Sequence, residues 1–390
     1  MNGRKNRDNF VRGAALLFVG GLLTMGQVML HVAQAADDEH AGHNMSGNAG
    51  PGHDMSGHDM AGHSTERDAK GRRLHDMKHD ISAETLEELR ARVLGWENIT
   101  AEEVALSMVQ MGPNYEWFIS DADVSGKTGV LILLHGFRER GDTVFKNRLQ
   151  PYADIFPMAM ALGMSMVMSQ HIQLGLDDLV ATGAENIVVV PIVSTKYNTM
   201  IRQWRYIFGL EDEPSYASVP RIQTDARIVF AAPLGDDPFV AEILLDYAME
   251  FSSDPAREVV IITAHGPSQD DDNRAQLALM DNLAKIVKED GGFSAVYTAT
   301  LQDDAPAEIR KANVQKLRDK VTSARADGKD VIVVTSLMGA YTIQSKLRKD
   351  LKGLDYKFNA KGLVQHDSFI EWIGETVRVE IEQYNRASAN

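Results

Sequence analysis

Thr128-Gly-Val-Leu-Ile-Leu-Leu-His-Gly-Phe-Arg-Glu-Arg-Gly141 contains a short apolar run that stops at His135. A second stretch, Arg257-Glu-Val-Val-Ile-Ile-Thr-Ala-His-Gly-Pro-Ser-Gln-Asp270, repeats the pattern and stops at His265. Such runs, bounded by turn residues, are typical of strands buried on both faces of a parallel sheet. Ligands of open α/β sheets bind beyond the carboxyl ends of the strands, where glycine lets the backbone turn sharply. We therefore predict that His135 and His265 are site residues.

The rest of the chain alternates between strand-like and helix-like patterns. Strands are expected near 129–134, 165–168, 187–191, 227–231, 259–264, 294–301 and 331–335. Helices are expected over 143–162, 174–183, 198–208, 239–251, 273–289, 307–326 and 342–351. Helices between successive strands imply right-handed crossovers and a parallel sheet. The sequence predicts an α/β protein with two similar halves, 127–222 and 223–385, after a helical lead-in over 81–126. Capping residues at Ser82 and Thr100 mark the two lead-in helices.

Composition narrows the classes of function. The chain has 390 residues, of which 44% are hydrophobic, so two halves of ordinary size with real cores are feasible. Its formal net charge of −15 argues against nucleic acid or an anionic membrane surface as a partner, because a polyanion would be repelled. There is no cysteine, so any metal site must use His, Met, Asp or Glu.

The first 35 residues have the pattern of an export signal. Arg4, Lys5, Arg7 and Arg12 precede an apolar stretch over 13–33, and Ala33-Gln-Ala35 is a small-x-small cleavage site. We predict a periplasmic or otherwise exported protein. If the segment stays uncleaved, it is expected to anchor the chain in the membrane.

Residues 36–80 are rich in His and Met among Gly, Ser and Asp, and they offer nothing with which to form a core. This composition predicts a disordered segment. Imidazole suits Cu, Ni, Co and Zn, and thioether adds a preference for Cu(I). The expected metal ligands are His40, His43, His53, His58 and His63. The alternative is a solvated linker of biased composition.

Four motifs in order carry a resemblance to a known family. They are Leu133-Leu-His-Gly136, Leu176-Asp-Asp-Leu-Val-Ala-Thr-Gly-Ala-Glu-Asn-Ile-Val-Val-Val-Pro191, Ala232-Pro-Leu-Gly-Asp-Asp-Pro238 and Thr263-Ala-His-Gly266. Together they resemble the two-copy form of the sirohydrochlorin chelatases, the small cobalt and iron chelatases of the class II tetrapyrrole chelatase superfamily. The resemblance covers about residues 128–375.

The resemblance implies two flavodoxin-like halves with a tetrapyrrole held in the cleft between them. It also implies that the histidine of each His-Gly motif binds the incoming divalent metal and helps to remove the pyrrole protons. His135 and His265 both match this position. The metal, Co, Fe or Ni, is then a substrate, and the predicted function is its insertion into a sirohydrochlorin-type ring.

One feature of the family is missing from this chain. Members carry a further histidine about eight residues after the proline that ends the third strand. The corresponding stretch, 191–199, and its echo, 335–342, contain no histidine. Tyr197 and Asn198 are weaker substitutes. This difference favours an alternative function, an exported metal-binding protein or metallochaperone that keeps the fold without catalysis. A third reading is a tetrapyrrole binder without turnover.

Several other charged residues are candidates for the site. Arg138, Arg140, Lys146 and Arg148 form a cationic stretch suited to the carboxylates of a tetrapyrrole, or a solvated helix surface. The carboxylates of 270–272 would attract a cation, or cap a helix and complement its dipole. His366 is a further candidate ligand or a helix cap, and His171 is a weaker candidate.

Overall fold

The computed structural model describes residues 66–70, 81–111, 119–162 and 166–388. The predicted export signal and all five histidines expected to bind metal before residue 66 lie outside these residues. Residues 66–70 belong to the segment predicted to be disordered, but they dock on the folded part. Arg67 pairs with the buried Asp178 at 2.5 Å, and Lys70 pairs with Asp121 at 3.2 Å.

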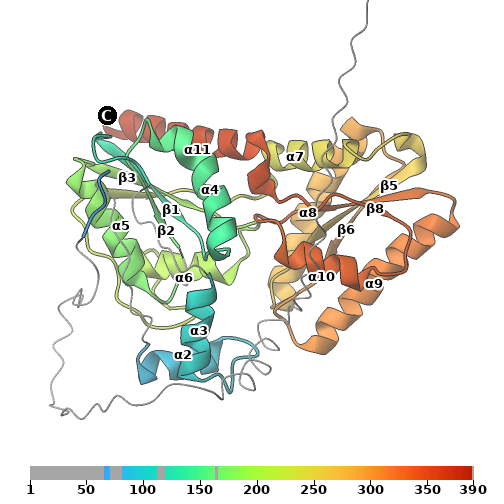
Figure 1. Ribbon diagram of the computed structural model, residues 1–390, viewed down its shortest axis with the longest axis horizontal. Helices are drawn as coiled ribbons and strands as arrows, with labels where there is room; N and C mark the ends of the chain where they lie inside the picture. Colours follow the sequence, from blue (N-terminus) through green and yellow to red (C-terminus); the bar gives the residue numbers. More distant parts are fainter. Residues whose placement is uncertain (1–65, 71–80, 112–118, 163–165, 389–390) are drawn as a thin grey trace, which may run out of the picture.

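Two four-stranded parallel sheets form the centre of the molecule (Figure 1). The first half contains the sheet β2-β1-β3-β4, with β1 Thr128–Leu133, β2 Met158–Ala161, β3 Asn186–Pro191 and β4 Arg227–Phe230. The second half contains the sheet β6-β5-β7-β8, with β5 Glu258–Ala264, β6 Ala295–Thr300, β7 Asp330–Thr335 and β8 Lys357–Phe358. The prediction of two similar α/β halves with parallel sheets is confirmed. In each sheet the strand that ends in His-Gly is central.

A helix follows each strand, so the two halves have the same order of elements. The helices are α4 Arg138–Ala153, α5 Ser169–Ala181, α6 Thr199–Ile207, α7 Pro238–Met249, α8 Asp270–Gly291, α9 Ala307–Ala326, α10 Thr342–Asp350 and α11 Asp367–Ser388. Short 3-10 turns span Pro255–Arg257 and Leu363–Gln365. No helix among the described residues is both long enough and apolar enough to cross a bilayer.

The lead-in consists of α2 Ala83–Arg92 and α3 Ala101–Met111. The Ser82 hydroxyl accepts a hydrogen bond from the Thr85 N–H at 3.0 Å, as the predicted cap requires. At α3 the Thr100 hydroxyl and the Glu103 carboxylate each accept from the other's backbone N–H, at 3.1 and 2.8 Å. These satisfied N–H groups explain where both helices begin.

The last helix of each half packs on the opposite half. Helix α7 follows β4 of the first sheet but packs on α8 and β7 of the second half. Helix α11 follows β8 of the second sheet but packs on β3 and α4 of the first half and on α7 (Figure 1). One apolar core therefore runs through both halves, from Val130 of β1 to Ile262 of β5.

One strand is predicted in the wrong place, and another is a strand as predicted but belongs to the other half. Residues 166–168, the described part of the strand predicted at 165–168, are not in a strand. Instead, β2 lies at Met158–Ala161, inside the range predicted as helix. The segment Met158-Ala-Met-Ala has no β-branched residue, so its composition continues a helical pattern, and only pairing with β1 makes it a strand. The strand at 227–231 is placed in the second half by chain order, but β4 pairs with β3 and completes the first sheet.

The exchanged helix α11 is fixed by a row of aromatic rings. Phe369 is 1% exposed and meets Phe145 of α4 edge to face at 6.2 Å, and Phe145 stacks on Phe137 at 5.0 Å. Removing the Phe369 ring would leave a cavity between the two helices. We expect Phe369→Ala to lower the free energy of unfolding by about 3–5 kcal/mol in urea denaturation.

The control for this prediction is Ile155→Ala, because the Ile155 side chain is exposed and its loss creates no cavity. Equal stability of the two variants would contradict the packing of α11 on the first half.

Candidate functional site

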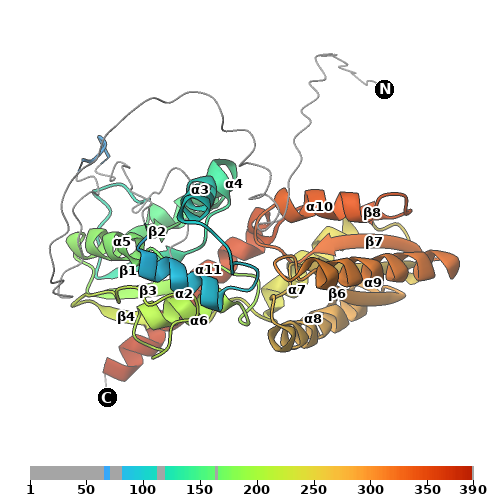
Figure 2. The same ribbon diagram turned by 90° about the horizontal axis from the view of Figure 1, so that it is seen from below.

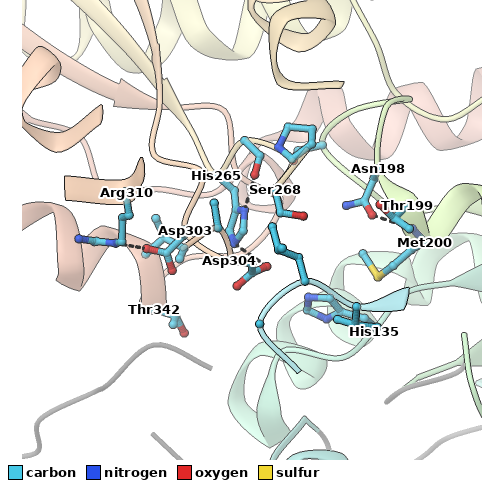
Figure 3. Close-up of a pocket in the computed structure, with 18 of the residues that line it drawn as sticks. His135, Asn198, Thr199, Met200, His265, Ser268, Asp303, Asp304, Arg310 and Thr342 are labelled. Atoms are coloured by element: carbon cyan, nitrogen blue, oxygen red, sulfur yellow. Dashed lines mark hydrogen bonds and ion pairs between the residues drawn. The ribbon is translucent and has the colours of Figure 1, made fainter. Parts of the chain in front are cut away.

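A cleft of about 1080 Å³ lies between the two halves at the carboxyl ends of the central strands. Its walls are the loops after β1, β3, β5, β6 and β7, together with the lead-in helices. The lining residues of the loops include 135–137, 193–195, 265–269, 303–308 and 337–340. Figure 3 shows His135 from the first half and His265 from the second half in this cleft. Both predicted histidines therefore lie in one cavity.

The two His-Gly corners have the same local structure. Gly136 and Gly266 have φ of 88° and 79°, a left-handed conformation that favours glycine. A Cβ on Gly266 would lie 2.7 Å from the Thr300 Cβ, so glycine is needed there for space as well. Each histidine Nδ1 is hydrogen-bonded to the carbonyl of the glycine that follows it. A carbonyl only accepts, so Nδ1 carries a proton, and in the neutral ring Nε2 keeps a lone pair for a metal ion or a proton.

Two carboxylates accompany His265 in the second half. The Asp304 Oδ2 lies 3.4 Å from the His265 Nε2. Ligand atoms of His265, Asp303 and Asp304 all lie within 4.8 Å of one another, the spacing of a metal-binding cluster. Neither Asp303 nor Asp304 is among the site residues predicted from the sequence. Their position in the sequence does indicate a site role, because Asp303 and Asp304 closely follow the carboxyl end of the strand predicted at 294–301.

The two aspartates have different roles. Asp303 is 2% exposed and pairs with Arg310 at 2.7 Å and with Lys346 at 2.6 Å. Burial would raise the pKa of Asp303, but His265, Lys346 and Arg310 together hold it below its usual range. Asp304 is 49% exposed in the cleft. Asp304 is therefore the carboxylate available to an incoming cation.

The backbone before these residues is held in an uncommon conformation. Gln302 has a φ of 48° and is one of two non-glycine residues with positive φ among those described. Its amide donates to the Asp270 carboxylate at 3.1 Å and accepts from Asn313 at 2.9 Å. These bonds tie the loop after β6 to the start of α8. They stabilise the turn after which Asp303 is buried and Asp304 is exposed in the cleft.

His135 is the neutral partner of this cluster. Burial lowers the pKa of His135; the Gly136 carbonyl and Asp304 oppose this effect, and His265 adds to it. The ring is therefore kept unprotonated at neutral pH, the form that binds metal or accepts a proton. It also packs on Phe137 at 4.8 Å, which links the histidine to the aromatic row beneath α11.

Two described arginines of the predicted cationic stretch, Arg140 and Arg148, do not line the cleft. The Arg138 side chain lies outside the described residues. The guanidinium of Arg140 lies over the Tyr341 ring, 4.2 Å from its centre, and so joins α4 to the start of α10. Arg148 donates to Asp367 of α11 at 2.7 Å. Neither Arg140 nor Arg148 is a lining residue of the cleft. Arg140 and Arg148 therefore make contacts between the halves.

The remaining candidate histidines lie elsewhere. The His366 Nδ1 accepts from the Ser368 N–H at 3.2 Å at the start of α11, and its Nε2 is 3.2 Å from the Asp246 carboxylate. The bond from Ser368 matches the interpretation of His366 as a helix cap. His171 is buried in α5, where its Nδ1 is 3.1 Å from the Leu162 carbonyl.

The carboxylates of 270–272 occupy the first turn of α8, where they complement the helix dipole. The N-cap is Gln269, without a side-chain cap bond, so the aspartates are not the cap. Asp272 pairs with Arg202 of α6 at 2.8 Å, a contact between the halves. Asn198, a proposed substitute for the missing histidine, lines the cleft, while its Oδ1 caps α6 through the Met200 N–H at 2.8 Å.

Comparison with known proteins finds a similar curated sequence and a similar solved fold. A sirohydrochlorin cobaltochelatase of Methanothermobacter thermautotrophicus is 28% identical over 140 residues, covering 33% of this chain and 94% of the relative. The structure of SirB from Bacillus subtilis with Fe3+ matches with a TM-score of 0.50 and 16% identity, over 65% of this chain and 96% of SirB. The second likeness concerns the fold. No family model matches the chain.

A buried acid supports the first His-Gly corner. Asp142 of α4 accepts from the Phe137 N–H at 2.6 Å through Oδ1, while Oδ2 is buried without a partner among the described residues. Burial raises the pKa of Asp142 to about 7, and the bond from Phe137 only partly opposes it. The folded protein therefore holds this proton more tightly than the unfolded chain does. Stability is lost as the pH rises from the unfolded pKa to about 7.

We expect Asp142→Asn to remove this loss of stability with rising pH. The amide cannot ionise, and its oxygen still accepts a hydrogen bond from the Phe137 N–H. Relative to the unchanged protein, the variant should gain on the order of 2 kcal/mol in unfolding free energy between pH 5 and pH 8. Urea denaturation at both pH values measures the gain. The exposed Asp327→Asn serves as control, and a pH-independent difference for Asp142→Asn would contradict a raised pKa.

Proposed function

We propose that this chain, which resembles the sirohydrochlorin chelatases in sequence and in fold, inserts a divalent metal, cobalt, iron or nickel, into a sirohydrochlorin-type tetrapyrrole. The observation that carries the proposal is the single cleft with one His-Gly histidine from each half and a carboxylate beside the second. Metal and ring are both substrates of this reaction. Catalysis needs a site where the two meet, and the cleft between the halves provides one.

The chemistry exchanges two pyrrole N–H protons for one cation. The lone pairs on the His135 and His265 Nε2 atoms suit this reaction, because imidazole both binds borderline metals and accepts protons near neutral pH. We assign His265 and Asp304 to holding the ion, since their ligand atoms are close together. We assign proton removal to His135, whose lowered pKa keeps it neutral. Asp304 offsets the positive charge that builds up as protons and metal pass through the cleft.

The ion pairs behind the cluster fit the same task. Asp303 is already neutralised by Arg310 and Lys346, and Arg310 also pairs with Asp350 at 2.7 Å. The ion would therefore be held by one imidazole and one free carboxylate. A weak site of this kind binds a metal and releases it again, as transfer to a ring requires.

We expect the protein to accelerate Co(II) insertion into sirohydrochlorin, followed by the change in absorption spectrum. His135→Ala should lower the rate at least about a hundredfold, the scale of a lost general base. Asp304→Ala should lower the affinity for Co(II) about tenfold or more. His366→Ala should match the unchanged protein in both measurements, because its ring lies at the start of α11.

Two results would count against these assignments. A rate with protein equal to the rate without it would remove the enzymatic function. A loss of metallation in His366→Ala larger than that in His135→Ala would transfer the site to a different part of the molecule.

A second candidate function is metal binding without catalysis, as an exported metallochaperone. The observation that favours it is the absence of histidine from the loops after β3 and β7, both of which line the cleft. Asn198 caps α6 at the end of the first loop, and Thr342 begins α10 directly after the second (Figure 3). Neither an amide nor a hydroxyl is a proton acceptor comparable to imidazole. On this candidate, metal captured by the His/Met-rich segment outside the membrane is the main activity.

We expect removal of residues 36–65 to abolish tight binding of Cu, Ni, Co or Zn while leaving the cleft intact, because the deletion removes the five predicted histidine ligands. It keeps Arg67 and Lys70, which contact the folded part. Isothermal calorimetry on both forms of the chain measures the difference. Equal stoichiometry and affinity would exclude a role for the segment.

A further inference from the structure

The lead-in helices form a wall of the cleft that neither half supplies. Leu94, Trp96 and Leu106 line the cleft from this segment, and we call these three residues the apolar wall. Arg92 lines it beside them. Figure 2 shows α2 and α3 on the first half, at the side next to the second half. The cleft is therefore bounded on one side by the apolar groups of the lead-in and elsewhere by the loops after β1, β3, β5, β6 and β7.

The apolar wall is built on a rigid base. Leu89, Ile99 and Val104 are buried in the same core cluster as Trp204 of α6. The Trp96 ring packs partly against this cluster, so one part of it is held and another lines the cleft. A wall fixed in this way costs little conformational entropy when a ligand binds.

Polar contacts fix the position of α2 as well. The Arg90 Nε donates to the Ile99 carbonyl at 2.8 Å, and the Arg92 Nη1 donates to the Pro214 carbonyl at 2.6 Å. The Glu88 carboxylate accepts from the Ser218 N–H. Residues 214–218 directly precede the segment that leads to β4, so the lead-in is bonded to the first half rather than loosely laid on it.

The cations around the apolar wall come from both halves. Arg92 of α2 and Lys311 of α9 both line the cleft and are exposed. Arg202 of α6 lines it too, 43% exposed despite its pair with Asp272. These positive groups stand out in a chain with a net charge of −15. They suit a ligand with an apolar flat face and anionic groups at its edge.

We propose that the apolar wall and Arg92 select the tetrapyrrole: Trp96 contacts the flat face of the ring, and Arg92 and Lys311 pair with carboxylates at its edge. This inference rests on the proposed function, because it assigns the binding of the ring in the same cleft. It gives the lead-in a role in specificity, separate from metal binding by His265 and Asp304. An aromatic side chain suits this contact, because stacking rewards a planar ligand over a flexible one.

The test uses uroporphyrin I, a planar tetrapyrrole with carboxylates at its edge, and follows quenching of its fluorescence on the full-length protein. We expect Trp96→Ala to raise the Kd about tenfold and Trp96→Phe to raise it less than about threefold. Arg92→Ala should raise the Kd about fivefold, and the effect should shrink at high salt. Leu210→Ala, which changes an exposed apolar residue outside the cleft, should leave the Kd unchanged.

Binding of Co(II) alone separates this inference from the proposed function. Trp96→Ala should bind Co(II) as the unchanged protein does, because Trp96 is no ligand. If the unchanged protein binds uroporphyrin I and Trp96→Ala and Arg92→Ala bind it equally well, the apolar wall has no role and the inference is overturned. If the unchanged protein binds Co(II) but no uroporphyrin I, the proposed insertion reaction fails together with it.

Discussion

The packing of each half's last helix on the other half is the constraint on which the site depends. Because α7 lies on the second sheet and α11 on the first, the two halves share one apolar core and cannot separate without exposing it. The row of rings from Phe369 through Phe145 and Phe137 to His135 connects this core to the cleft. The helix exchange therefore fixes the two His-Gly corners in one cavity.

Within this nearly symmetric frame the chemistry is asymmetric. Both corners present an imidazole whose Nδ1 is bound to the carbonyl of the following glycine, but only the loop after β6 adds an aspartate pair, with Asp304 next to the His265 Nε2. One member of that pair is neutralised by buried cations and the other remains in the cleft. The first half contributes a neutral histidine, together with the apolar wall that its lead-in supports. On the proposed function, the second half holds the metal, and the ring contacts both the lead-in and α9.

Features that lower stability gather around this cleft. Asp142 is a buried acid under the first corner, and Gln302 holds a left-handed backbone beside the second. Tyr341, with a φ of 100°, begins α10 at the cleft edge and stacks on Arg140 of the other half. Strained or buried polar positions of this kind persist only when the surrounding structure stabilises them, and they are common at functional sites. The continuous core provides that stabilisation.

The sequence alone determined the strands that end in His-Gly, the order of most helices, and the position of His135 and His265 at the cleft, because these depend on local patterns and on one rule for parallel sheets. The strand at 158–161, the place of β4 in the first sheet and the exchange of α7 and α11 were decided by pairing between distant segments. Contacts between distant segments also decided the separate roles of Asp303 and Asp304. They likewise placed Arg140 and Arg148 in contacts between the halves, whereas the sequence predicted that these arginines bind substrate. Partners such as Lys346, Tyr341 and Asp367 are remote in the chain from the charges that they contact, and no local pattern encodes these pairs. Tertiary packing decides those pairs, since a buried charge is tolerated only where folding brings it an opposite charge.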